Sequence, residues 1–145
     1  MDINTIENKI KLLVEELDKP TVIKWAYKCA KRALNEWGQN SKEFLELLEI
    51  LNTINPYLKG LLNVSEVRKE ALKAHNIAKK QTDLSKQYLT RSIGHAVASI
   101  HVKTHSLGMI HYIKKLNLIQ DSEKAKQELL WQLTILRRMG KSIES

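Results

Sequence analysis

The sequence predicts an all-α fold, in which one domain, residues 1–145, forms a bundle of about six helices around a buried central helix. Apolar residues recur at intervals of three and four along most of the chain, which is the period of an amphipathic helix. No segment alternates apolar and polar residues as a strand does, and no Asn-Gly hairpin turn is present. With 145 residues, 43% of them hydrophobic, the chain is long enough to bury one core.

The first two predicted helices occupy the N-terminal quarter of the chain. The helix at residues 3–17 has one apolar stripe: Ile6, Ile10, Leu13 and Leu17. After a break at residues 18–21, a second helix continues to Trp37 and stops at Gly38. Its apolar stripe includes Trp25 and Cys29, so a buried inert thiol is favoured over a nucleophile.

Two helices follow, and each begins at the spacing of a capping box. Asn40 and Glu43 mark the start of the third helix, which an Asn-Pro pair ends at residues 55–56. Asn63 and Glu66 mark the start of the fourth helix in the same way. This helix has a face of small residues, which predicts close packing on a neighbour: Val67, Ala71, Ala74 and Ala78. Its opposite face is basic and carries Lys69, Lys73 and Lys80.

The predicted central helix begins after a cap at residues 82–83 and includes residues 91–116, with a kink near residues 104–108. One face of its wheel contains Gly94, Ala98, His101, His105, Gly108 and Tyr112. Only a narrow arc is left for water: Ser99, Lys103, Ser106 and Lys114. A helix that is apolar or small over most of its circumference is surrounded by other helices. The glycines each cost about 1 kcal/mol of helix propensity, so we expect close approach there and a face buried against another helix.

The last predicted helix covers residues 122–139 after a turn at 117–121. It directs Leu129, Leu133 and Leu136 inward, and Gly140 is expected to end it.

Positive charge is concentrated in the middle of the chain. The net charge is +8; residues 1–49 contain 8 Lys or Arg and 9 Asp or Glu, whereas residues 59–115 contain 11 and 3. Such a surface can bind nucleic acid, an anionic membrane or an acidic protein. No apolar run approaches about 18 residues and the first residues are polar, so neither a membrane span nor a signal peptide is predicted. The single cysteine fits a cytoplasmic protein.

The histidines are the one group in the sequence that could carry chemistry. His101 and His105 are four residues apart on a helix, the spacing at which two imidazoles bind one metal ion. His75 could be a third ligand if the fourth helix packs there. Two further histidines are expected to point elsewhere: His95 and His111. Because no HExxH motif is present and residues 84–120 contain no acid, structural histidines are favoured and no cofactor is expected.

Other enzymatic and nucleic-acid-binding signatures are missing from the sequence. It contains no glycine-rich phosphate loop, no nucleophile elbow and no carboxylate pair with acid–base spacing, so we expect no catalytic residue. The basic face with Lys69, Lys73 and Lys80 has no interleaved aromatic residues, which argues against a nucleic-acid platform. These lysines are typical of a solvated face, and they are also the candidate contacts for an anionic partner.

Four segments of the chain carry a family resemblance: KWAYKCAKRAL, SEVRKEALKAHNIAKK, RSIGHAVASIHVKTHSLGMIHYIKK and the LLWQL of the last helix. In them the chain resembles the small all-helical immunity proteins encoded beside bacterial polymorphic toxins, some relatives of which carry an exonuclease-related label. The densest part of the match includes Gly94, His95, Ala96, His101, Val102, His105 and Gly108. The chain departs from alanine-rich relatives at residues 103–104 and 109–111.

The resemblance implies a protein that binds and neutralises a cognate toxin without catalysis. It assigns no contact residue, so the exposure of the large aromatics would be informative: Trp25, Trp37, Tyr57, Tyr88 and Trp131. A protein toxin is the expected partner, neither nucleic acid nor membrane is expected, and a homodimer is compatible with the sequence. One alternative is a metal-dependent helical enzyme built on His75, His101 and His105. The other is a nucleic-acid-binding module that uses Lys69, Lys73 and Lys80.

Overall fold

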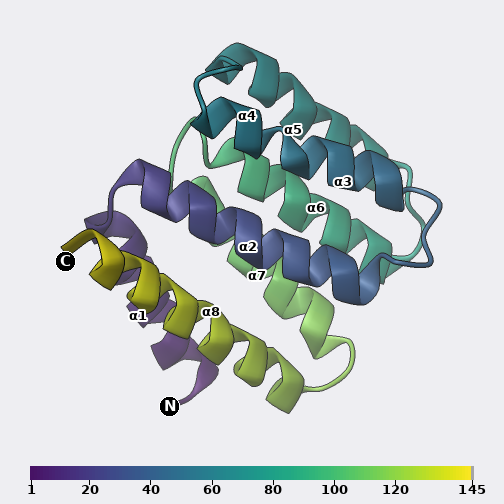
Figure 1. Cartoon of the computed structure of the whole chain (residues 1–145). Coiled ribbons are helices and arrows are strands. Elements are labelled where there is room, and N and C mark those ends of the chain that lie inside the picture. Colours follow the sequence, from purple (N-terminus) through teal and green to yellow (C-terminus); the bar gives the residue numbers. More distant parts are fainter. Residues whose placement is uncertain (145) are drawn as a thin grey trace.

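The computed structural model describes the backbone of residues 1–144, which form eight helices and no strand (Figure 1). The helices are α1 (Ile3–Glu16), α2 (Lys19–Trp37), α3 (Phe44–Asn52), α4 (Ile54–Leu58), α5 (Val64–Lys79), α6 (Leu84–Ala98), α7 (His105–Leu118) and α8 (Ser122–Glu144). The predicted all-α fold is confirmed. The number of helices exceeds six because the predicted central helix is divided into α6 and α7, and because the short helix α4 follows α3.

Helix α6 occupies the centre of the arrangement. It packs against α5 and α7 along most of its length and also contacts α2 and α3. Helix α2 lies across the middle of the molecule, with α3, α4 and α5 on one side and α1 and α8 on the other (Figure 1). The buried helix in the middle was therefore predicted correctly, but it is shorter than expected. Within residues 1–144, no helix combines the length and apolar character that crossing a lipid bilayer requires.

The predicted central helix at residues 91–116 is wrong as one continuous element. Helix α6 ends at Ala98, residues 99–104 form a compact turn, and α7 then packs against α6. The hydroxyl groups of Ser99 and Ser106 donate to the carbonyl oxygens of Ala96 and Lys103, at 2.6 and 2.7 Å. Such local hydrogen bonds offer the backbone an alternative to the helical ladder. The break therefore occurs before the expected kink and is a full change of direction.

The polar arc predicted for this helix is also wrong. Ser99 and Ser106 are fully buried rather than hydrated. The Lys103 ammonium donates to the carbonyl oxygens of Glu15 and Leu17, both at 2.7 Å, at the end of α1. In return, the Lys19 ammonium donates to the carbonyl oxygen of His101 at 3.1 Å. These contacts tie the turn at residues 99–104 to the junction of α1 and α2.

Several helix ends differ from the prediction. Ser41, rather than Asn40, pairs with Glu43: the Ser41 hydroxyl donates to the carboxylate at 2.6 Å. Residues 54–58, which include the Asn-Pro pair expected to end the third helix, form the separate short helix α4. Helix α8 continues through Gly140, where an added Cβ would lie 3.0 Å from a Leu17 methyl group, so close packing explains this glycine and a helix stop does not.

The start of α5 and the main core positions were predicted correctly. The Asn63 side chain accepts from the Glu66 amide at 2.8 Å, and the Glu66 carboxylate accepts from the Asn63 amide at 3.2 Å, which completes the capping box. Asp83 caps α6 by accepting from two backbone amides. The predicted inward faces of α5 and α8 are buried: Val67, Ala71, Ala74, Ala78, Leu129, Leu133 and Leu136. In α1, the deepest stripe includes Val14 in place of the half-buried Leu13 and Leu17.

Candidate functional site

Three histidines meet where α5, α6 and α7 come together. The ring centre of His95 lies 5.3 Å from that of His75 and 6.3 Å from that of His105. The ring of Tyr112 stacks on His95 at 5.4 Å. The prediction that His95 points elsewhere is wrong, because α7 packs back onto α6 and makes His95 the centre of the cluster. We call these four side chains the histidine cluster.

The two glycines of the predicted central face lie against this cluster. A Cβ added to Gly94 would lie 2.9 Å from the Cε1 and Nε2 atoms of His75, and one added to Gly108 would lie 2.5 Å from Nδ1 of His95. The close approach expected at both glycines is therefore confirmed, with imidazole rings as the neighbours. The expectation of a wholly buried face is wrong, because His101 and His105 are exposed.

Burial favours the neutral form of the two inner histidines, His75 and His95. Desolvation lowers the pKa of His95 to about 4, and the adjacent His75 and His105 rings add electrostatic repulsion. Desolvation also lowers the pKa of His75, and the Arg91 guanidinium, which donates to His75 Nδ1 at 2.9 Å, acts in the same direction. His95 Nδ1 is buried without a hydrogen-bond partner. No acidic side chain lines the hollow of about 220 Å³ beside these rings.

The predicted metal ligands line this one hollow together. His75, His101 and His105 all border it, and so does His95, which was not among the predicted ligands. In the part of the chain that the structure describes, no three His, Cys, Asp or Glu side chains are arranged to hold a metal ion. Since Nδ1 of His75 already accepts from Arg91, one imidazole is committed to an internal contact. That these histidines are structural and hold no metal stays a prediction.

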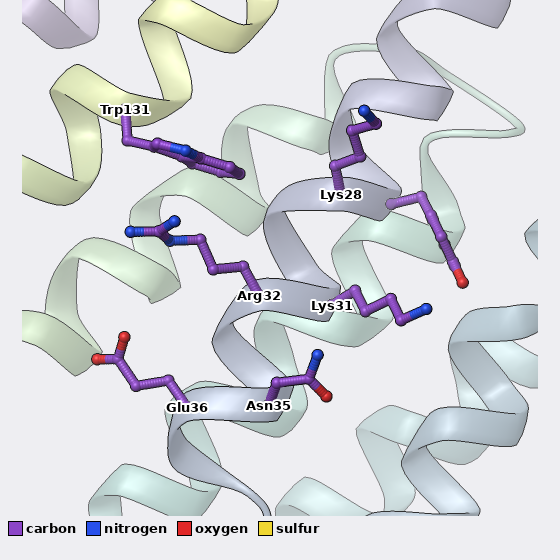
Figure 2. A pocket seen from close by; sticks show the side chains of 7 residues that line it. Lys28, Lys31, Arg32, Asn35, Glu36 and Trp131 are labelled. Carbon is purple, nitrogen blue, oxygen red and sulfur yellow. The ribbon is translucent and has the colours of Figure 1, made fainter.

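A larger and more open surface, which the sequence reasoning missed, lies over the exposed side of α2, with Tyr27 at its edge toward α3 and Trp131 of α8 at its other edge. We call it the α2–α8 groove; it has a volume of about 720 Å³ and is lined by Tyr27, Lys28, Lys31, Arg32, Asn35, Glu36 and Trp131. Six of these residues follow each other along one side of α2, and Trp131 reaches toward them from α8 (Figure 2). Their helical spacing on α2 was visible in the sequence, but nothing in it placed Trp131 opposite them.

Arg32 is the most tightly held side chain of the groove. Its Cζ atom lies 4.2 Å from the centre of the Trp131 ring, and its Nε donates to the two Glu128 carboxylate oxygens at 3.1 and 3.3 Å. The Glu128 side chain is only 8% exposed, and burial raises its pKa while Arg32 opposes that rise. At the end of the groove, Lys124 forms an ion pair with Glu36. Both carboxylates at the groove are thus neutralised from within the chain.

The chain matches one known protein family over most of its length. Residues 12–138 match a family described as Imm-5 like putative immunity protein. The chain belongs to this family. The resemblance read from the four sequence segments is therefore confirmed. No curated protein and no solved structure matches the chain.

In this immunity-family chain, the large aromatics differ in their exposure. Trp25 is fully buried, and its indole N–H donates to the carbonyl oxygen of Gln132 at 2.9 Å. The other four are half-buried: Trp37, Tyr57, Tyr88 and Trp131. Of these, Trp131 lines the α2–α8 groove, where it lies against an exposed arginine. Aromatic and arginine side chains that lie together are the composition of protein-binding hot spots.

The basic face predicted on α5 of this immunity-family chain is present and exposed. Lys69, Lys73 and Lys80 all lie in solvent. The Lys73 ammonium donates to the Glu70 carboxylate at 2.8 Å, so its charge is already compensated. Lys80 borders a hollow beside the N-terminal end of α3, and neither Lys69 nor Lys73 lines that hollow. The three lysines do not share one concave surface, and their role as contacts stays a prediction.

The single cysteine is placed as expected. Cys29 is fully buried on α2 and forms no disulfide. Burial raises the pKa of its thiol well above the usual value, so the nucleophilic thiolate is disfavoured.

Proposed function

We propose that this chain is an immunity protein that binds a cognate bacterial toxin and blocks it without catalysis of its own. The observation that carries the proposal is family membership across residues 12–138. The proposal extends to its setting: one folded domain that acts in the cytoplasm, on a protein toxin and not on nucleic acid or a membrane. A homodimer stays compatible with it.

The chemistry of the described side chains supports binding over catalysis. The Cys29 thiol is buried and protonated, and the Glu128 carboxylate is held by Arg32. The histidine cluster has no carboxylate in its hollow that could orient an imidazole as a general base. By contrast, the α2–α8 groove presents an arginine, lysines and aromatic rings to solvent. Of these groups, the arginine and the aromatic rings belong to the residue types that contribute most to protein–protein affinity.

Co-expression with the toxin encoded by the neighbouring gene tests this proposal. We expect the wild-type chain to restore growth and to form a complex that survives gel filtration. We also expect the purified chain to show no nuclease or hydrolase activity. Failure to bind the toxin and to restore growth would refute the proposal.

Two measurements address the alternative functions directly. Titration with duplex DNA and with RNA at increasing salt would reveal a nucleic-acid-binding module, because affinity would fall steeply with ionic strength. Substitution of His101 and His105 by Gln should leave rescue intact. If this variant folds but no longer restores growth, His101 and His105 belong to the functional site.

A further inference from the structure

We propose that the α2–α8 groove is the surface that docks the toxin, and that its ligand is an acidic segment carrying an apolar side chain among its carboxylates. This inference rests on the proposed function and assigns it a surface and a partner chemistry. Three properties of the groove point to such a segment: its uncompensated positive charge, a guanidinium fixed in advance, and an aromatic ring at each edge.

The charge of the groove is positive after its internal ion pairs are taken into account. Arg32 is paired with Glu128, and Glu36 is paired with Lys124. Lys28 and Lys31 are exposed, and neither takes part in an ion pair within residues 1–142. The Lys31 ammonium instead lies 5.6 Å from the centre of the Tyr27 ring. The ammonium groups of Lys28 and Lys31, on adjacent turns of α2, are therefore available for ion pairs with a partner. The side-chain carboxylates of a protein can form such ion pairs.

Arg32 offers a further carboxylate-binding position that is already oriented. Its hydrogen bonds to Glu128 both use Nε, which leaves the N–H groups of both Nη atoms available to a further acceptor. The Trp131 ring fixes the plane of the guanidinium from one side (Figure 2). A planar pair of N–H donors matches the two oxygens of a carboxylate. Because the side chain is held before binding, little rotamer freedom is lost when the partner arrives.

The two aromatic side chains of the groove, Tyr27 and Trp131, explain why the segment should also carry an apolar side chain. Tyr27 and Trp131 are half-buried and pack against the hydrophobic core, so each ring presents one surface to the groove. The Tyr27 hydroxyl donates to Asn52 at 2.7 Å, which fixes that ring from behind. Desolvation of such rigid rings by an aliphatic or aromatic side chain adds to affinity at little entropic cost.

The α5 basic face lacks these properties. Lys73 is compensated by Glu70, and the three lysines do not line a common hollow. Charge reversal is therefore expected to slow toxin association when it is made in the groove and not when it is made on the α5 basic face. Variants of the α5 basic face are the matched control.

The experiment compares two double variants in toxin binding. Lys28→Glu/Lys31→Glu reverses the groove, and Lys69→Glu/Lys73→Glu makes the same change of charge on α5; all four lysines are exposed, so both variants should fold. At low salt, we expect the groove variant to associate about 10-fold or more slowly with the neighbouring gene's toxin and to dissociate at nearly the wild-type rate. The α5 variant should stay within about 2-fold of the wild type.

A third variant separates shape from charge. Asn35→Trp fills the groove from its exposed α2 side without a change in charge. We expect it to shorten the lifetime of the complex by about 10-fold or more while the association rate changes little, since most interface substitutions act on dissociation. Circular dichroism and the melting temperature establish that each variant is folded.

The outcomes distinguish the two proposals. A wild-type chain that neither binds nor neutralises the toxin refutes the proposed function. A wild-type chain that binds, together with unaffected Lys28→Glu/Lys31→Glu and Asn35→Trp variants, keeps the function and overturns the groove. Slower association in the α5 variant alone assigns docking to α5. Competition by duplex DNA at the groove would overturn a protein segment as its ligand.

Discussion

Replacement of Gly108 by alanine tests the closest approach of a side chain to any of the five glycines. The new methyl group would lie 2.5 Å from Nδ1 of His95 and 2.8 Å from its Cγ and Cε1 atoms. Ordinary contacts between such atoms are about 3.5–4 Å, so the methyl group and the ring cannot both stay in place. The ring cannot simply swing away, because Cγ lies at its base and the rings of His75, His105 and Tyr112 surround it.

Two opposing contributions decide the size of the effect. Alanine is favoured over glycine within a helix by about 1 kcal/mol. Overpacking of a tight site costs about 1–3 kcal/mol, and a displacement of 1 Å at the base of the ring belongs in the upper part of that range. We therefore expect a net loss of about 1–2 kcal/mol. For a chain of this length that lowers the melting temperature by about 3–6 °C.

The assay is a double-mutant cycle measured by urea unfolding and circular dichroism. In a His95→Ala background the obstructing ring is absent, so Gly108→Ala should be neutral or stabilising by up to about 1 kcal/mol. The difference between the two backgrounds then isolates the contact. A Gly108→Ala variant that is more stable than the wild type, with the same effect in both backgrounds, would show that the approach of α7 to His95 is not tight.

Two further predictions concern the histidine cluster. Since the folded-state pKa of His95 is about 4, below the usual 6.5, the unfolded chain takes up this proton first, and stability is lost as pH falls from about 7 toward 4. This pKa shift corresponds to a contribution of at most about 3 kcal/mol to the free energy of unfolding, and the partial exposure of His95 reduces that contribution to about 1–2 kcal/mol. In urea unfolding, the His95→Gln variant should therefore lose less stability than the wild type between pH 7 and about 4.5. Because the histidines are predicted to be structural, elemental analysis should find no stoichiometric zinc, nickel or iron. A chelator should leave the melting temperature unchanged. About one ion per chain, or a lowered transition, would contradict that prediction.

The sequence was informative where periodicity and local chemistry agree. The inward faces of α2, α5 and α8 follow from the spacing of apolar residues, and the caps at Asn63 and Asp83 follow from short-range hydrogen bonding. It failed at residues 99–104, where no glycine or proline marks the break. Both α6 and α7 are largely buried, so the apolar pattern continues across the turn and resembles that of one long helix.

That one break accounts for most of the errors at the sites. A continuous wheel placed His101 and His105 beside Gly94 and turned His95 away, whereas the real turn brings His95 between His75 and His105. The α2–α8 groove depends on tertiary packing in a different way. The charged side of α2 is typical of a solvated helix surface, and only the position of α8 makes Trp131 a wall beside Arg32.

The contacts of α1 and α8 also determine when the helices can finish packing during synthesis. The ammonium of Lys103 and the carbonyl groups that it binds are 86 and 88 residues apart. At about 5–20 residues per second, the end of α1 waits on the order of 4–17 s for that partner. Helix α8, against which α1 packs and which supplies Trp131, emerges after the other seven described helices. A nascent chain that stops before residue 122 has an uncovered α1 and a one-sided groove. We therefore expect protection from the toxin to begin only after the last helix leaves the ribosome, which release of stalled chains of increasing length would measure.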